Sequence, residues 1–331
     1  MEKEQIKPFA GKVVVITGAS SGIGKATAMA LAKQGASLVL AARRAEILEQ
    51  VATDCIQLGG QAVAVTTDVT QEHSLLALAE AALAFGRKID VWINNAGAGA
   101  LGAYDETPMA AHEQVIQINL LGHMRGSYAV LPIFKLQGYG HLINTISLGA
   151  FAPMPYAVAY SASKYGLRGF SEALRAELTQ FPGIQISDVF PAFIDTPGFQ
   201  HAGNYIGKKI KPAPPVYEPQ LVAEAMVSLV RKPKPGVMVG SFGYLARFSN
   251  ALFPGSTRKF AARMMEQYFE QADSVPLTDG SLFQPSRVGT DVSGGWREPS
   301  SGKSKGTAAA LLVAGIASVL FYFSRRGARL R

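Results

Sequence analysis

The chain has 331 residues, 48% of them hydrophobic, which is enough for one large or two small globular domains. Its formal net charge of +8 would suit a nucleic-acid-binding protein, but residues 272–331 hold eight Lys or Arg against four acids, so half of the excess lies in the tail. Because the remainder has no dense basic stripe interleaved with aromatic residues, we do not expect nucleic acid as a partner.

Cysteine and histidine usage narrows the possibilities further. Cys55 is the only cysteine, which excludes an internal disulfide and fits a reducing compartment. The five histidines show no metal-ligand spacing, so we expect no metal site. The charged N-terminus, residues 1–8, lacks the apolar stretch of a secretory signal.

Short apolar runs alternate with longer helical patterns from residue 13 onward. This alternation predicts a parallel sheet with helices on both faces, a doubly wound, Rossmann-like α/β fold. The runs typical of buried strands are Val13–Ile16, Ser37–Ala41, Ala62–Thr66, Val91–Asn94, His141–Ile146, Gln185–Phe190 and Gly236–Val239. The segments with helical periodicity are Ile23–Gln34, Ala45–Leu58, Gln71–Phe85, His112–Gln137 and Ala159–Phe181.

Residues 197–217 interrupt this rhythm. They contain three lysines and several prolines without clear periodicity. A loop of this length is unusual in a compact domain unless it covers a site. Helices are expected again over Pro219–Arg231, Tyr244–Leu252 and Thr257–Gln271, so we expect one domain over residues 1–271.

The composition changes after Gln271. Residues 272–306 are rich in Ser, Gly, Pro and Asp, which predicts a flexible linker. Residues 307–324 carry no charge, and eighteen helical residues span roughly 27 Å, close to the minimum for a bilayer core. We therefore expect a C-terminal transmembrane helix over 307–324 and a basic tail over 325–331; a buried helix of a globular domain is the alternative.

A glycine cluster follows the first predicted strand. Gly18, Gly22 and Gly24 stand in the run Thr-Gly-Ala-Ser-Ser-Gly-Ile-Gly, where the next helix begins. Glycines at such a point allow a tight turn and a close approach of the backbone to a phosphate. The helix N-terminus adds free N–H groups and a positive dipole, so the run predicts a site for a pyrophosphate.

The second predicted strand is followed by Arg43 and Arg44. In dinucleotide-binding folds an acidic residue about 20 residues past the glycines holds the ribose 2′-OH, and none is present here. Arg43 instead suits a 2′-phosphate, because its guanidinium is charged, planar and forked. The sequence therefore favours NADP(H) over NAD(H), with solvated charges at the start of a helix as the alternative.

Polar residues also mark the next two strands and a helix. Asp68 and Val69 follow the third strand, where Asp68 either reaches the adenine or caps a helix. The run Asn94–Gly97 ends the fourth strand, at the edge where ligands bind in such sheets. Asn119 lies inside a long predicted helix despite its poor helix propensity, which indicates a functional or backbone-bridging role.

Tyr160 and Lys164 stand four residues apart, and Ser147 lies thirteen residues before the tyrosine. Residues four apart share one helix face, so the phenol and the ammonium are able to point into one cleft. A free tyrosine has a pKa of about 10, and a nearby cation lowers the pKa of a phenol. The spacing predicts a tyrosine tuned as a general acid or base. Alone, the Tyr-x-x-x-Lys pattern also fits a packing aromatic and a solvated charge.

Together, these motifs resemble the classical short-chain dehydrogenase/reductase (SDR) family over about residues 10–240. The resemblance implies hydride transfer between NADP(H) and a carbonyl/alcohol pair. It implies Tyr160 as the general acid/base and Ser147 as the group that polarises the substrate oxygen. It further implies that Lys164 binds the nicotinamide ribose and lowers the tyrosine pKa, and that Asn119 holds a water. The residues it implies around the cofactor are Gly18, Ser20, Gly22, Ile23, Gly24, Arg43, Asp68, Val69, Asn95, Ala96, Gly97, Tyr160, Lys164, Ile194 and Thr196.

One departure from the family pattern follows the sixth predicted strand. The Pro-Gly pair of the family reads Pro191-Ala192 here, and the added methyl group lies where the resemblance places the nicotinamide. We expect the cofactor still to bind, because Ile194 and Thr196 remain in place.

The substrate is expected to be apolar. Residues 153–156, Phe193 and the 197–217 loop suggest an apolar pocket, in which Tyr156 either contacts substrate or packs. A membrane anchor also keeps an enzyme near lipid-soluble compounds, which favours a lipid, steroid, retinoid or long-chain carbonyl. The alternatives are a small polar ketone or 3-oxoacyl thioester, and, from another class, a non-catalytic NADP(H)-binding protein at a membrane.

Location and assembly complete the expectations. Because NADP(H) is intracellular and no signal sequence is visible, we expect a cytoplasmic catalytic domain with the tail inserted after synthesis. A positive-inside count favours a cytoplasmic C-terminus, so the tail orientation stays open. The family resemblance implies a homodimer or homotetramer formed through the helices around Asn119 and Tyr160.

Overall fold

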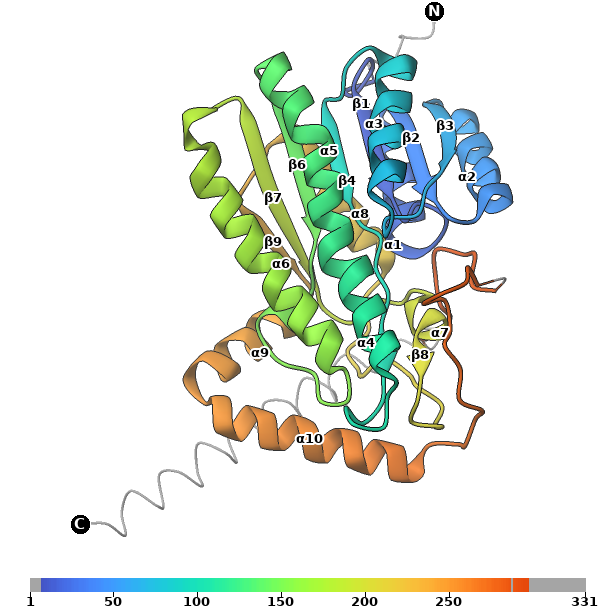
Figure 1. Ribbon diagram of the computed structural model, residues 1–331, viewed down its shortest axis with the longest axis vertical. Helices are drawn as coiled ribbons and strands as arrows, with labels where there is room; N and C mark the ends of the chain where they lie inside the picture. Colours follow the sequence, from blue (N-terminus) through green and yellow to red (C-terminus); the bar gives the residue numbers. More distant parts are fainter. Residues whose placement is uncertain (1–6, 287, 298–331) are drawn as a thin grey trace, which may run out of the picture.

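The computed structural model describes residues 7–286 and 288–297 (Figure 1). Its strands are β1 (Val13–Thr17), β2 (Ser37–Ala42), β3 (Gln61–Thr66), β4 (Val91–Asn94), β5 (Ala100–Leu101), β6 (Gly140–Thr145), β7 (Ile184–Pro191), β8 (Gly203–Asn204) and β9 (Gly236–Val239). Its α-helices are α1 (Gly22–Ala32), α2 (Ala45–Gln57), α3 (Glu72–Gly86), α4 (Met109–Ile116), α5 (Gly122–Gln137), α6 (Val158–Glu177), α7 (Gly198–His201), α8 (Pro219–Arg231), α9 (Ser241–Leu252) and α10 (Pro254–Gln271).

Seven strands form one sheet in the order β3-β2-β1-β4-β6-β7-β9, and every neighbouring pair is parallel. The strands are short and rich in β-branched residues, and most are buried on both faces because helices cover the sheet on both sides (Figure 1). The predicted doubly wound, Rossmann-like parallel sheet is therefore confirmed.

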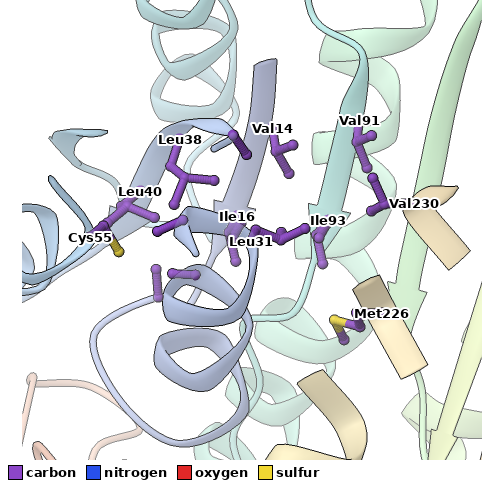
Figure 2. Packing of buried hydrophobic residues seen from close by; sticks show 14 of the residues in the cluster. Val14, Ile16, Leu31, Leu38, Leu40, Cys55, Val91, Ile93, Met226 and Val230 are labelled. Atoms are coloured by element: carbon purple, nitrogen blue, oxygen red, sulfur yellow. The ribbon is translucent and has the colours of Figure 1, made fainter. Parts of the chain in front are cut away.

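Alternate residues of each strand feed two hydrophobic clusters, one on each face of the sheet. On one face Val14 and Ile16 pack with residues of α1, α2 and α8. Figure 2 shows this cluster, including Met226 and Val230 of α8. On the other face Val15 packs with residues of α3, α5 and α6. Side chains of a strand point alternately to opposite faces, so continuous apolar runs were the right signal for these strands.

The predicted helix over His112–Gln137 is interrupted. It consists of α4, a π-helical turn over Gln117–Leu121, and α5. π-Turns are rare and are often found at functional sites. This one contains Asn119, so the irregular part of the helix coincides with a residue singled out from the sequence.

The 197–217 loop and the segment after α10 pack on each other. β5 and β8 form a small parallel pair, and residues 204 and 208 make antiparallel bridges to residues 278 and 274. The described part of the predicted linker is thus hydrogen-bonded to the domain. Composition does not reveal these contacts, because they are made by backbone groups. The domain boundary at residue 271 itself stays a prediction.

The predicted transmembrane helix over 307–324 and the tail over 325–331 lie outside the described residues. Among the helices within 7–286 and 288–297, none is long and apolar enough to cross a membrane.

Candidate active site

The polar motifs meet at the carboxyl edge of the main sheet. β1 and β4 are neighbours near its centre, and the chain runs from them toward opposite ends of the sheet. Such a switch point is where ligands bind in open α/β sheets. The glycine-rich turn follows β1, the Asn94–Gly97 run ends β4, Ser147 follows β6, and Ile194 follows β7. The topology therefore gathers segments that are far apart in sequence.

Ser147, Tyr160 and Lys164 are brought together, as the sequence predicts. Tyr160 and Lys164 lie one turn apart on α6, and Ser147 caps the short 3₁₀ turn after β6, its Oγ accepting from Gly149 N at 3.0 Å. The Ser147 and Tyr160 side chains lie together, since a Cβ on Gly149 would be 3.1 Å from Tyr160 Cε1 and 3.5 Å from Ser147 Oγ. Lys164 is 4% exposed, and its Nζ lies 5.7 Å from the Tyr160 ring centre and donates to Thr145 O at 3.1 Å.

Burial governs the protonation of this pair. It lowers the pKa of Lys164 from 10.5 to about 7. Burial also raises the pKa of Tyr160, while the nearby Ser147 hydroxyl acts in the opposite direction. Lys164 is not among the causes of this shift, so burial and not the ammonium sets the direction of the Tyr160 pKa in the chain itself, and the lowering of that pKa by Lys164 stays a prediction. Tyr160 is held as a neutral phenol, the form that donates a proton.

Asn119 bridges the chain after β4 to α6. Its Oδ1 accepts from Ala98 N and its Nδ2 donates to Ala98 O, both at 2.8 Å, and Nδ2 also reaches Ser163 Oγ at 3.2 Å. Asn119 is fully buried. Its side chain thus links the backbone of Ala98 to Ser163 of α6. This is the backbone-bridging role that its poor helix propensity indicated.

Two glycine positions of the glycine-rich turn leave no room for a side chain. Gly18 has φ +67°, and a Cβ on it would meet Ala96 Cα at 2.8 Å. A Cβ on Gly24 would lie 2.2 Å from Gly18 O. Ser21, the N-cap of α1, makes no side-chain cap hydrogen bond, so the first N–H groups of the helix are not capped by it. A backbone cradle beside a helix N-terminus fits a pyrophosphate.

The asparagines of the Asn94–Gly97 run have different partners. Asn94 is buried inside the sheet, where its Nδ2 donates to Asn144 Oδ1 at 3.0 Å and so joins β4 to β6. Asn95 lies at the edge, where its backbone N–H donates to Thr17 Oγ1 at 2.9 Å and its Nδ2 donates to Thr17 O at 3.1 Å. The run therefore supports the glycine-rich turn, and Ala96 and Gly97 continue along it.

The residues after β2 and β3 surround the start of α1. Arg44 donates to Ser20 Oγ from Nε at 3.2 Å and from Nη2 at 3.0 Å. Burial lowers the pKa of Arg43, and the nearby Asp68 opposes this. Asp68 Oδ1 accepts from Thr70 N and Oγ1 at 2.9 and 2.8 Å, so it closes a local turn ahead of α3 and does not cap the helix.

Ile23 and Val69 serve packing. Ile23, in the first turn of α1, packs against the core cluster on its face of the sheet. Val69 packs closely on α5, since a Cβ on Gly122 would lie 3.0 Å from its Cγ2.

The segment after β7 closes the site opposite the glycine-rich turn. Ile194 is 5% exposed and belongs to the core. Thr196 touches the turn, since a Cβ on Gly22 would lie 3.2 Å from Thr196 Cβ. The Ala192 methyl group has room because it faces Gly240, on which a Cβ would approach it to 3.0 Å.

Two further residues join the site. His123 Nε2 donates to Ala96 O at 3.0 Å, and burial lowers the pKa of His123 to about 3, so the ring stays neutral. His123 stands four residues after Asn119, on the same helix face, and this spacing was a signal that the sequence contained. Ser163 donates to Tyr160 O at 2.7 Å and lies beside Asn119. Within residues 7–286 and 288–297, no cluster of His, Cys, Asp or Glu is placed to hold a metal ion.

Comparisons with known proteins identify the family. A family model described as short chain dehydrogenase matches residues 12–204. The chain belongs to the short-chain dehydrogenase family. An uncharacterized oxidoreductase, YxnA, of Bacillus subtilis is 32% identical over 289 residues, which are 85% of this chain and 80% of that protein.

Two solved structures extend the comparison to the cofactor. An alcohol dehydrogenase of the archaeon Thermococcus sibiricus, complexed with 5-hydroxy-NADP, is 30% identical with a TM-score of 0.60, over 69% of this chain and 95% of that one. A metagenomic short-chain oxidoreductase in complex with NADP has the same identity and TM-score, over 70% and 97%. This short-chain dehydrogenase uses a nicotinamide dinucleotide, NAD(P)(H), and the glycine cradle at the start of α1 fits that group.

Proposed function

We propose that the protein is an NADP(H)-dependent oxidoreductase that interconverts a carbonyl and an alcohol. The observation that carries the proposal is the convergence of Ser147, Tyr160 and Lys164 beside the glycine cradle. A pure binding protein needs no phenol, hydroxyl and buried ammonium in one place. Arg43, with no acidic residue at the end of β2, supports NADP(H) over NAD(H).

The nicotinamide supplies the hydride when the cofactor is bound. In the reductive direction Tyr160 then gives its proton to the substrate oxygen. Ser147 donates a hydrogen bond to the same oxygen, which stabilises the developing negative charge. The glycine turn and Arg43 hold the phosphates, and Lys164 and Asn119 fix the positions of α6 and the chain after β4.

Replacement of Tyr160 by phenylalanine tests the role of the phenol. We expect NADPH oxidation, followed at 340 nm, to fall by about 10² to 10⁴ while NADPH binding is kept. Tyr165→Phe is the matched control, because Tyr165 lies on the same helix but is 41% exposed. Undiminished turnover in Tyr160→Phe would refute the assignment, and unchanged biological activity would favour the non-catalytic binding protein.

We propose an apolar substrate of the lipid, steroid, retinoid or long-chain type. Aromatic contacts of Tyr156 and Phe193, two residues of the predicted pocket, support this. Tyr156, at φ +61°, packs edge-on against Phe269 with 5.1 Å between the ring centroids. The ring centroids of Phe193 and Phe242 lie 5.9 Å apart. A panel of carbonyls graded in size and apolarity tests the proposal. Preference for a small polar ketone or a 3-oxoacyl thioester would reject it.

We propose that the tail anchors the protein to a membrane, with the catalytic domain in the cytoplasm. The uncharged run 307–324 supports the anchor. α9 and α10 also expose large apolar side chains, among them Phe248 (67%) and Phe260 (69%), with Arg258 and Lys259 beside the latter. Deletion of residues 307–331 is expected to release the protein into the soluble fraction; persistent membrane association would reject an anchor confined to the tail.

We also propose a homodimer or homotetramer built on α4, α5 and α6. Exposed Tyr128 (66%) and Leu136 (91%) on α5 support a covered face there. Light scattering of the protein lacking residues 307–331 tests this, and a monomer would reject it.

A further inference from the structure

The residues after α10 return to the site and lie against the cofactor-binding turn. We call residues 281–286 and 288–296 the strap. After the chain leaves α10, the strap passes α7 and β8 and reaches the start of α1 (Figure 1). At its beginning Leu282 is fully buried in a cluster with Ala111 and Val115 of α4 and Ala159 of α6, the helix that carries Tyr160.

One side of the strap binds the phosphate-binding half of the site through backbone carbonyl groups. Arg43 donates to the carbonyls of residues 281, 282 and 283, and Arg44 to those of residues 286, 288 and 289. Gly22 N donates to Asp291 O at 2.9 Å, and Lys25 Nζ reaches Thr290 O at 3.4 Å. The strap thus touches the first turn of α1 and the end of β2 together.

The other side of the strap is held by one buried carboxylate. Asp195, in the segment after β7, is 5% exposed. Its oxygens accept from Ser293 Oγ at 2.7 Å, Gly294 N at 3.0 Å and Trp296 N at 2.9 Å. Among the described residues, every hydrogen bond to this carboxylate comes from the strap. Hydrogen bonds to an ionised carboxylate are about twice as strong as neutral ones.

The neighbours of Asp195 reinforce the same contact. Trp296 Nε1 donates to Thr196 O at 2.8 Å, and Gln200 Nε2 donates to Gly294 O at 3.0 Å. His201 Nε2 donates to Val288 O at 3.0 Å. The strap therefore joins the segment after β7 to the glycine-rich turn, and both segments carry residues that are assigned above to the dinucleotide site.

We infer that the strap is part of the dinucleotide site, that Asp195 is the residue that positions it, and that bound NADP(H) leaves only after the strap detaches. The inference rests on the dinucleotide site assigned above and not on the identity of the substrate. It assigns a cofactor-retaining role to residues beyond the 12–204 region that the family model matches.

The dissociation rate of NADPH tests the inference without any turnover. In stopped-flow experiments the full chain is loaded with NADPH and chased with excess NADP⁺, and the fluorescence of the reduced nicotinamide reports release. We expect Asp195→Asn to raise the dissociation rate at least about tenfold, because the amide is uncharged and keeps only one of the two acceptor oxygens. Ser293→Ala, which removes one donor, is expected to raise it several-fold.

Asp105→Asn, at an exposed carboxylate, is the control and should leave the rate unchanged. Hydrogen exchange at the amides of Gly294 and Trp296 reports independently whether the strap has detached. Faster exchange with an unchanged NADPH dissociation rate would overturn the inference. So would faster association and tighter binding in Asp195→Asn, because the strap would then compete with the cofactor.

Failure of the strap inference can be told apart from failure of the proposed function. If Asp195→Asn does not fold, the same criteria are applied to Ser293→Ala, which leaves the carboxylate in place. A wild-type chain that binds neither NADPH nor NADH would overturn the dinucleotide site itself, and the inference with it. Loss of carbonyl turnover alone affects neither the site nor the strap.

Discussion

Replacing Lys164 by methionine should make the protein more stable while it stops the chemistry. The ammonium is 4% exposed and donates to one described protein oxygen, Thr145 O at 3.1 Å. No carboxylate forms an ion pair with it among the described residues. A buried cation without a counter-charge is costly. Its position beside Tyr160 thus serves function at the expense of stability.

The lowered pKa gives the size of this cost. Burial lowers the Lys164 pKa from 10.5 to about 7, and each pKa unit corresponds to about 1.4 kcal/mol. The charged form of Lys164 is therefore disfavoured in the folded state by about 5 kcal/mol. Methionine fills a similar volume but leaves Thr145 O without its donor, which costs about 1–3 kcal/mol. We expect a net gain of about 2–4 kcal/mol in the free energy of unfolding at pH 7.

The sign of the pH dependence follows from the same values. Between about pH 7 and pH 10.5 the unfolded lysine binds a proton that the folded one has released, so this residue makes wild-type stability rise with pH. The advantage of Lys164→Met should therefore be largest at pH 7 and shrink as the pH approaches 10. Urea unfolding of both proteins at pH 7, 8 and 9 measures it, with exposed Lys33→Met as a control expected within about 0.5 kcal/mol of wild type. A less stable Lys164→Met, or a difference that does not change with pH, would refute the reasoning.

Three further results are expected. Asn119→Ala leaves the N–H and C=O of residue 98 unpaired. It should lower the free energy of unfolding, measured in urea, by about 2–4 kcal/mol, since each buried unpaired group costs about 1–3 kcal/mol. A loss under about 1 kcal/mol would mean that water replaces the asparagine side chain. Arg43→Ala should weaken NADPH binding in calorimetry at least about tenfold more than NADH binding, and equal losses would refute the 2′-phosphate role. Burial lowers the pKa of His141 to about 4, so below about pH 6.5 the unfolded state binds the extra proton and the free energy of unfolding falls as the pH drops. His141→Gln should reduce this slope by up to about 1.4 kcal/mol per pH unit in acid titrations. An unchanged slope would contradict the lowered pKa.

The main sheet was predictable because its signal is local. Runs such as Val13–Ile16 are continuous and β-branched, and burial on both faces demands that pattern. For each predicted strand both ends lie within one residue of the prediction, and the Pro219–Arg231 helix begins with the proline at which the sequence predicts its start. The π-turn over residues 117–121 was not predicted. Apolar residues continue through it, since a π-turn shifts the helix face without removing any of them, so the pattern indicated one unbroken helix.

The catalytic group was predictable for a different reason. Ser147, Tyr160 and Lys164 belong to motifs whose spacing is fixed by one helix and one strand end, so the sequence carries their geometry. The tyrosine pKa was not predictable, because it depends on how much water reaches the phenol, and that depends on packing from elements far along the chain. Spacing alone therefore indicated which groups meet but not which protonation state they keep.

The strap shows where sequence reasoning stops. Its composition is that of a linker, and its contacts with Arg43, Arg44 and Gly22 use carbonyl groups that every residue type possesses. The clearest side-chain signal lies in the segment after β7, where Asp195 is an acid close to the end of a buried strand, and its burial requires donors. A buried carboxylate that accepts no hydrogen bond from its own segment therefore indicates where a polar, glycine-rich segment binds on a domain.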